Sequence, residues 1–146
     1  MKILGIGVDI IQNKRIRNLI YNKIFLSRTF SKNELIISKK VSRKTNYFSK
    51  RFAAKEAFAK SIGTGFRKNL NFKDIEILNN KLGKPFYSKT KKIDTIIKKK
   101  FKVKNYNLFL SISDEKDYSI AFTIIQTKQW LTKTLLLKTP RLFFTL

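Results

Sequence analysis

The stretch from Arg51 to Phe66, with the sequence RFAAKEAFAKSIGTGF, constrains this chain more than any other part. Alanine, lysine, arginine and glutamate favour helices, and no proline or β-branched residue interrupts residues 48–61, so the sequence predicts a helix there. Phe48 and Phe52 are four residues apart and can pack inward together. Gly63 is suited to the left-handed conformation that ends many helices.

Glu56 lies at the edge of the apolar stripe of this helix, where a carboxylate without a partner is costly. Lys60, one turn later, is one candidate partner, and the segment is then a surface helix with an ordinary ion pair. The alternative is a metal and anion site. In that case Glu56 holds a divalent cation, while lysines and the backbone of Gly63, Thr64 and Gly65 face phosphates.

The charge of the chain and the residue types it lacks limit its chemistry. With 33 basic and 9 acidic residues, the net charge is +24, which indicates an anionic partner such as a nucleic acid, an acidic protein or a membrane surface. A+T-rich coding would also produce many lysines. Cysteine and histidine are absent, which excludes disulfides, thiolate nucleophiles, the usual zinc sites and Ser-His-Asp triads. Any metal is therefore expected to be a hard cation such as Mg²⁺, held by carboxylates.

A length of 146 residues predicts one domain. We assign residues 1–127 to it and regard residues 128–146 as an apolar and basic tail of unknown role. The N-terminus has a strand pattern without the apolar core of a signal peptide, and no run approaches the ~20 apolar residues of a membrane span. We expect a cytoplasmic protein.

The first strand and helix supply further candidates. Residues 2–11 predict a buried strand in which Gly5 and Gly7 permit a close approach by a neighbour. Asp9 interrupts the apolar run, either as a metal ligand or paired carboxylate, or as a capping residue where the strand ends. Residues 12–25 predict a helix, with basic residues on its outer face and apolar residues facing inward. These apolar residues are Ile16, Leu19, Ile20 and Ile24.

The rest of the chain predicts a mixture of helices and hairpins without βαβ regularity. A capping box at Ser31 and Glu34 starts a short helix. Strands at 72–78 and 86–87 form a hairpin, residues 90–101 form a helix, and strands at 108–113 and 118–126 form a second hairpin. The predicted class is α+β, with an antiparallel sheet packed against helices.

Several short segments, taken in order along the chain, together resemble one family. They are Gly5-Ile-Gly-Val-Asp-Ile10, the stretch that begins at Arg51, Phe72-Lys-Asp-Ile-Glu-Ile-Leu78, Leu82-Gly-Lys-Pro85 and Ser111-Ile-Ser113. From about Ile3 to Ile125 the chain resembles the holo-[acyl-carrier-protein] synthases, the small bacterial type of 4′-phosphopantetheinyl transferase.

This resemblance implies the 4′-phosphopantetheinyl transferase-like fold and a Mg²⁺-dependent reaction. The 4′-phosphopantetheine arm of coenzyme A is transferred to a serine of apo-acyl carrier protein, in support of fatty acid biosynthesis. It implies a homotrimer with active sites between neighbouring subunits. The family's metal ligands fall on Asp9 and Glu56. Its docking face for the acidic carrier protein falls on Lys14, Arg15 and Arg17.

Roles for further residues follow from this resemblance and from residue chemistry. Two carboxylates together with substrate phosphates are the usual setting for Mg²⁺, so the catalytic candidates are Asp9, Glu56 and Lys60. The sequence leaves open which group accepts the serine proton: Lys60, Glu56 or a metal-bound water would each serve. We expect contacts with coenzyme A from Arg51, Lys55, Lys60, Gly63, Thr64, Gly65, Lys84 and Pro85.

One position departs from the family pattern Ser-x-Ser-His, which ends here in Ser113-Asp114. If the family's histidine contacts the nucleotide of coenzyme A, Asp114 would repel a phosphate there, and the surplus of lysines would offset that repulsion. The tail after Gln126 is also generally absent from the family. Two alternatives stay open. One is a basic RNA-binding protein, indicated by the charge and by the interleaved aromatic residues Tyr47, Phe48, Phe52 and Phe101. The other is a degenerate transferase that acts only as a binding module.

Overall fold

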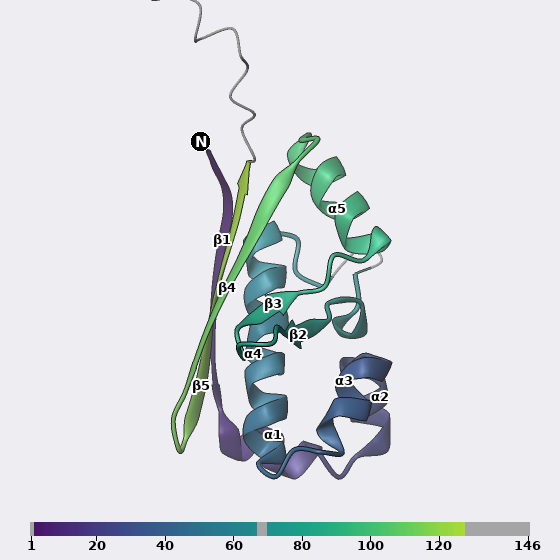
Figure 1. The fold of residues 1–146 in the computed structure, drawn as a ribbon, viewed down its shortest axis with the longest axis vertical. Helices are drawn as coiled ribbons and strands as arrows, with labels where there is room; N and C mark the ends of the chain where they lie inside the picture. Colours follow the sequence, from purple (N-terminus) through teal and green to yellow (C-terminus); the bar gives the residue numbers. More distant parts are fainter. Residues whose placement is uncertain (1, 67–69, 128–146) are drawn as a thin grey trace, which may run out of the picture.

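A computed structural model of the chain describes residues 2–66 and 70–127. A three-stranded antiparallel sheet in the order β1-β5-β4 lies along helix α4, and the two-stranded sheet β2-β3 lies beside β4 (Figure 1). The strands are β1 (Ile3–Gln12), β2 (Ile77–Asn79), β3 (Pro85–Tyr87), β4 (Tyr106–Asp114) and β5 (Tyr118–Thr127). The helices are α1 (Asn13–Leu19), α2 (Lys23–Thr29), α3 (Lys32–Ser38), α4 (Lys44–Ile62), the 3₁₀ turn η1 (Phe72–Asp74) and α5 (Lys91–Phe101). The predicted α+β class is confirmed.

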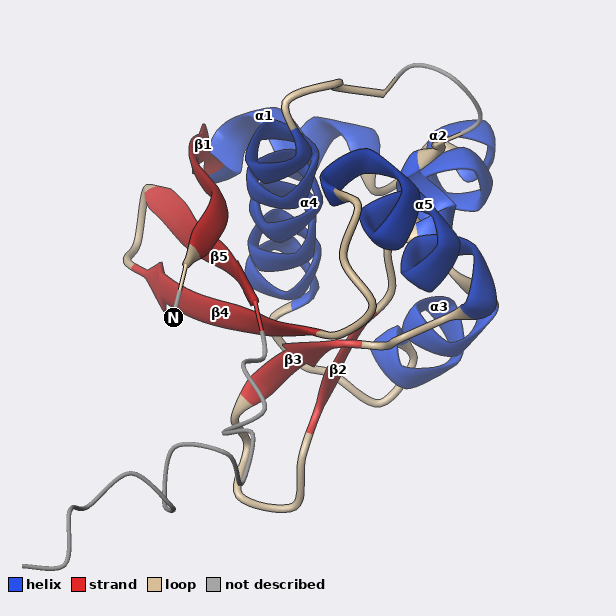
Figure 2. Ribbon diagram, turned by 90° about the horizontal axis from the view of Figure 1, so that it is seen from above, coloured by secondary structure: helices blue, strands red, loops and turns tan. Residues whose placement is uncertain are grey.

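The three-stranded sheet has one covered face and one open face. Seen from above, α4 covers the inner face and the other helices lie around α4 (Figure 2). Side chains alternate along β5, where Ala121 and Thr123 are buried while Ile120 and Phe122 are 40 % exposed. This alternation is the period-2 pattern of a strand with a single buried face. Within the described residues, no helix is both long and apolar enough to cross a membrane.

Helix α4 approaches β1 closely because two glycines leave room for its backbone. A Cβ atom on Gly7 would lie 1.8 Å from the carbonyl oxygen of Ala57, and one on Gly5 would lie 2.0 Å from that of Ser61. Both distances are shorter than any real contact, so neither position tolerates a side chain without moving the helix. The close approach expected from these glycines is confirmed.

The prediction of one helix over residues 12–25 is wrong, because the chain forms the two shorter helices α1 and α2 there. The Asn22 side chain caps α2 by accepting hydrogen bonds from the backbone of Ile24 and Phe25. The new helix starts with a different rotation, so the apolar stripe does not continue across the break. Ile24 is therefore 64 % exposed and Leu19 is 38 % exposed, although both were expected in the core.

The strand predicted over residues 72–78 is also shorter than expected. Its first part forms η1, in which the Asp74 carboxylate accepts a hydrogen bond from the backbone of Asn71. Local side-chain capping thus prevails over the alternating pattern. The hairpin turn before Pro85, the helix predicted over residues 90–101 and the β4-β5 hairpin are confirmed, and Thr90 is the N-cap of α5. The predicted tail lies outside the described residues.

Replacing Gly7 with alanine is expected to destabilise the protein by about 3 kcal/mol or more, because the new methyl group meets backbone atoms that cannot rotate away. Gly83→Ala is the matched control. Gly83 has φ 81° and open space around its Cα, so that variant should lose only about 1 kcal/mol from backbone strain. Chemical denaturation of both variants measures the difference. Equal stability losses would mean that the contact between β1 and α4 is not as close as described.

Candidate active site

Two carboxylates and a lysine meet where β1 passes the C-terminal half of α4. Asp9 lies within β1, and its Oδ1 is 2.8 Å from Nζ of Lys60. Burial raises the pKa of the Glu56 carboxyl above its ordinary value, the negative charge of Asp9 raises it further, and Lys60 opposes both effects. Asp9 and Glu56 are therefore close enough to repel each other. The alternative that Asp9 caps the end of a strand is wrong, since β1 continues to Gln12.

This group suits a hard divalent cation that completes its coordination with other ligands. Within residues 2–66 and 70–127, no cluster of three or more His, Cys, Asp or Glu side chains is placed to hold a metal. A pair of carboxylates matches the way Mg²⁺ is commonly bound, through one or two protein carboxylates plus water and phosphate oxygens. The mutual repulsion of Asp9 and Glu56 favours such a cation between them. The side chain of Lys60 is 53 % exposed, so its ammonium group is accessible to a ligand.

The expected glycine loop lies at the end of α4, one turn after Lys60. Gly63 has φ 74°, and its N–H donates to the carbonyl oxygens of Ala59 and Lys60. That amide is used by the helix cap, so it is not available to a phosphate. The hydroxyl of Thr64 donates to the carbonyl oxygen of Gly65. The expected left-handed cap at Gly63 is confirmed, and the contribution of the loop to phosphate binding stays a prediction.

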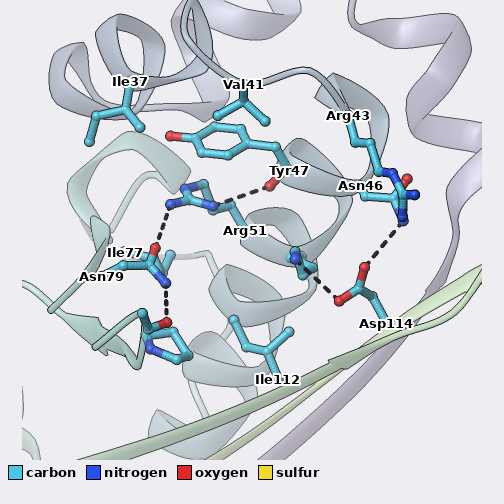
Figure 3. Close-up of a pocket in the computed structure, with 13 residues that line it drawn as sticks. Ile37, Val41, Arg43, Asn46, Tyr47, Arg51, Ile77, Asn79, Ile112 and Asp114 are labelled. Carbon is cyan, nitrogen blue, oxygen red and sulfur yellow. Dashed lines mark hydrogen bonds and ion pairs between the residues drawn. The ribbon is translucent and has the colours of Figure 1, made fainter. Parts of the chain in front are cut away.

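A second group of expected residues lines a cavity of about 470 Å³ between α4, β2-β3 and β4 (Figure 3). The guanidinium group of Arg51 lies 3.6 Å from the centre of the Tyr47 ring, and its Nη2 donates to Oδ1 of Asn79 at 3.0 Å. Its Nε is buried and has no hydrogen-bond partner in the part of the chain that the structure describes. Pro85 lies in the cavity wall. Arg51 is only 5 % exposed, so its expected contact with coenzyme A stays a prediction, and the cavity combines apolar walls with the more accessible cation Lys50.

The carboxylate group and this cavity lie on different flanks of α4. Arg51 and Glu56 are five residues apart, so they project about 140° apart around the helix. The sheet separates the two groups in the same way, because Asp9 lies on β1 and Asp114 lies on β4, the opposite edge strand. One chain therefore carries the carboxylates and the cavity in two separate places.

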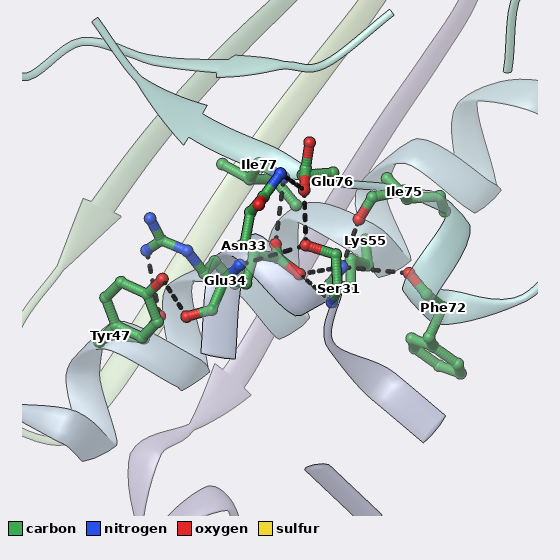
Figure 4. Close-up of polar contacts among 10 residues, drawn as sticks. Ser31, Asn33, Glu34, Tyr47, Lys55, Phe72, Ile75, Glu76 and Ile77 are labelled. Atoms are coloured by element: carbon green, nitrogen blue, oxygen red, sulfur yellow. Dashed lines mark hydrogen bonds and ion pairs between the residues drawn. The ribbon is translucent and has the colours of Figure 1, made fainter. Parts of the chain in front are cut away.

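The expectation that Lys55 contacts coenzyme A is corrected by its position in the core (Figure 4). Its side chain has no exposed surface, and Nζ lies 2.8 Å from Oε2 of Glu34, whose side chain is equally buried. The ammonium group also donates to the carbonyl oxygens of Phe72 and Ile75. Glu34 accepts further hydrogen bonds from the backbone N–H groups of Ser31 and Ile77. This buried pair ties α3, α4 and the segment before β2 together, and it leaves no donor for a ligand.

The sequence pattern gave no signal for the residue that fixes the start of the basic helix α1. Asn13 is 1 % exposed, and its side chain donates to the carbonyl oxygens of Glu115 and Lys116 and accepts from the hydroxyl of Ser119. These bonds attach α1 to the β4-β5 turn. The expected docking residues project into solvent from this helix. They are Lys14, Arg15 and Arg17.

Two remaining expectations concern exposed groups. Lys84 is exposed next to the cavity, and its backbone N–H donates to the Asn80 side chain, so a contact with coenzyme A stays a prediction. The aromatic side chains considered for RNA stacking are mostly in the core, with Tyr47 at 6 % and Phe48 at 3 % exposure. Phe52 and Phe101 are partly buried and pack against the same core. Side chains held in the core are not free to stack on bases, so the structure does not favour the RNA-binding alternative.

The comparisons of this chain with known proteins all point to the same family. A profile of the 4′-phosphopantetheinyl transferase superfamily matches residues 5–123. A holo-[acyl-carrier-protein] synthase from Pelagibacter ubique is 59 % identical over 128 residues, which are 88 % of this chain and 100 % of the relative. The crystal structure of a holo-[acyl-carrier-protein] synthase from Neisseria meningitidis is 36 % identical, covers 86 % of this chain and 100 % of its own, and superposes with a TM-score of 0.77. The Bacillus anthracis synthase in complex with CoA (3′,5′-ADP) is 34 % identical, covers 86 % and 98 %, and has a TM-score of 0.72.

Lys55→Met is expected to lower the free energy of unfolding by about 3–5 kcal/mol, because it leaves the Glu34 charge buried without its partner. Lys60→Met removes an ion pair of the same chemical type in which the lysine is solvent-exposed. That control should cost at most about 1 kcal/mol. Urea denaturation of both variants measures the contrast. A Lys55→Met protein as stable as the control would show that the buried pair does not hold the helices together.

Proposed function

We propose that this chain, which belongs to the 4′-phosphopantetheinyl transferase superfamily as a holo-[acyl-carrier-protein] synthase, performs a Mg²⁺-dependent reaction in the cytoplasm that supports fatty acid biosynthesis. The hydroxyl oxygen of a serine on apo-acyl carrier protein attacks the phosphorus atom next to the pantetheine arm of coenzyme A. The P–O bond to the other phosphate breaks, the serine proton passes to a base, and adenosine 3′,5′-bisphosphate leaves. The observation that carries the proposal is the meeting of Asp9, Glu56 and Lys60 between β1 and α4.

In this proposal Asp9 and Glu56 hold the Mg²⁺ ion, which would offset the charge of the pyrophosphate when bound. Lys60 is placed to donate to a phosphate oxygen, because its exposed ammonium group already lies beside Asp9. Phosphoryl transfer depends mainly on positioning and on compensation of negative charge. These three side chains supply both functions from two rigid elements, a strand and a long helix.

The cavity at Arg51 is proposed to bind the nucleotide end of coenzyme A. Its apolar walls suit a purine ring, and the partly exposed ammonium group of Lys50 in the same wall suits an anionic oxygen. Coenzyme A is also the ligand of the Bacillus anthracis synthase. Because helix α4 separates this cavity from Glu56 within one chain, we propose that the cavity of one copy completes the carboxylate site of a neighbouring copy in a homotrimer.

The open face of the sheet supports an assembly of copies. Val8 and Phe122 are neighbours on this face, as are Ile10 and Ile120, and they are between 40 % and 59 % exposed. Phe109 extends the apolar surface onto β4 with 48 % exposure. A continuous exposed apolar surface across three strands is typical of an interface between chains.

The carrier protein is proposed to dock on α1. Lys14, Arg15 and Arg17 project from this helix, and the bonds of Asn13 fix its start against the β4-β5 turn. Docking there would bring an acidic partner to the chain segment that directly follows β1, which carries Asp9.

Glu56→Gln and Asp9→Asn are each expected to reduce transfer by about 100-fold or more, because each removes a proposed metal ligand. The assay incubates the enzyme with apo-acyl carrier protein, coenzyme A and Mg²⁺ and measures the mass of the carrier protein. Asp94→Asn is the control, since Asp94 pairs with Lys98 on α5 and should be dispensable. Wild-type rates in Glu56→Gln, with the fold verified by circular dichroism, would refute the proposed site.

Charge reversal of Lys14 and Arg15 to glutamate is expected to raise the KM for the carrier protein about tenfold at low salt and to leave the KM for coenzyme A unchanged. The physical reason is the loss of electrostatic attraction to an acidic partner. The same double reversal on α5, at Lys99 and Lys100, is the control for net charge. A carrier-protein KM that responds equally to both pairs of substitutions would argue against docking on α1.

A further inference from the structure

We propose that Asp114 sets how tightly the nucleotide cavity holds phosphate, because its carboxylate competes with phosphate for the same donors. In the free protein its carboxylate occupies the position at Lys50 and Asn46 that an anionic oxygen of the nucleotide would take. The residue thereby weakens retention of the product, adenosine 3′,5′-bisphosphate. This inference rests on the proposed function and adds a determinant of product release to it.

The position of Asp114 places its carboxylate directly on two donors of the cavity (Figure 3). Oδ1 lies 3.2 Å from Nζ of Lys50, and Oδ2 accepts a hydrogen bond from Nδ2 of Asn46 at 3.2 Å. Lys50 and Asn46 are four residues apart on α4, so they form one continuous patch of the cavity wall. Two donors at this spacing would equally receive two oxygens of a phosphate.

The charge pattern of the cavity shows why this carboxylate matters. Arg43, Lys50 and Arg51 line the cavity, and Asp114 is the one acidic side chain among the described residues that do so. Asp114 also lines the adjoining cavity, which it shares with Arg43 and Asn46 and where Glu115 adds a second carboxylate. Without the Asp114 charge the wall would be uniformly cationic and would hold a phosphate more strongly.

The ion pair is suited to exchange with a ligand. The side chains of Lys50 and Asp114 are 35 % and 31 % exposed, and pairs this accessible to water are weak. A phosphate accepts the same charge-assisted hydrogen bonds as a carboxylate but carries more negative charge and more acceptor oxygens, so it displaces Asp114. The displaced carboxylate stays close and repels the phosphate. The product therefore dissociates more readily than it would from the cations alone. This matters because product release limits the turnover of many enzymes.

The test compares Asp114→Asn with Asp117→Asn by calorimetric titration of adenosine 3′,5′-bisphosphate into the full-length protein. Both variants lose one negative charge on the same turn, but Asp117 does not line the cavity. Asp114→Asn should bind the bisphosphate about threefold to tenfold more tightly than wild type. It should also show stronger product inhibition. Asp117→Asn should remain within about twofold of wild type, since it is screened from the cavity by solvent.

Adding Lys50→Met to Asp114→Asn should remove the gain, because the freed lysine is the expected phosphate partner. Equal affinities of the two single variants, or weaker binding by Asp114→Asn, would overturn the inference. Transfer by the wild-type enzyme in the mass assay distinguishes a failure of the inference about Asp114 from a failure of the proposed function. If the wild type transfers the arm but Asp114→Asn binds the bisphosphate with the wild-type affinity, only the role of Asp114 is refuted. An inactive wild type that binds no bisphosphate refutes the proposed function as well.

Discussion

The close contact between helix α4 and strand β1 is the constraint on which the rest of the structure depends. Gly5 and Gly7 have no side chains, so the helix backbone lies against the strand at distances that a Cβ atom would forbid. At this separation Glu56 and Lys60 lie beside Asp9. A wider spacing would separate the two carboxylates and leave each as an isolated charge at the edge of an apolar surface.

The buried pair of Glu34 and Lys55 explains how adjacent residues on α4 take opposite roles. Successive helical residues project about 100° apart, so when Lys55 points into the core, Glu56 points along the sheet toward β1. The ammonium group of Lys55 and the carboxylate of Glu34 have their hydrogen-bonding capacity satisfied by each other and by backbone groups of three segments. A rotation of α4 would separate the two groups and leave a buried charge without its partner, which is costly.

The distribution of polar groups on two flanks of α4 is the basis of the proposed assembly. One flank carries the carboxylates, and the other carries the cavity with Arg51 and the pair of Lys50 and Asp114. The outer face of the sheet is apolar and exposed within one chain. These three features fit a symmetric arrangement in which each copy lends one flank to its neighbour.

The sequence by itself determined the secondary structure around the stretch from Arg51 to Phe66, the glycines that permit close packing, and the pairing of a strand aspartate with a helix glutamate as site candidates. These follow from local propensity, from residue chemistry and from the resemblance to a family. Only the tertiary structure decided that Lys55 is a core residue and that Lys60 pairs with Asp9 across 51 residues. It also decided that Arg51 and Glu56 lie on different flanks of α4. The physical reason is that a helical pattern specifies which residues share a face, whereas the partner of each face depends on segments far away along the chain.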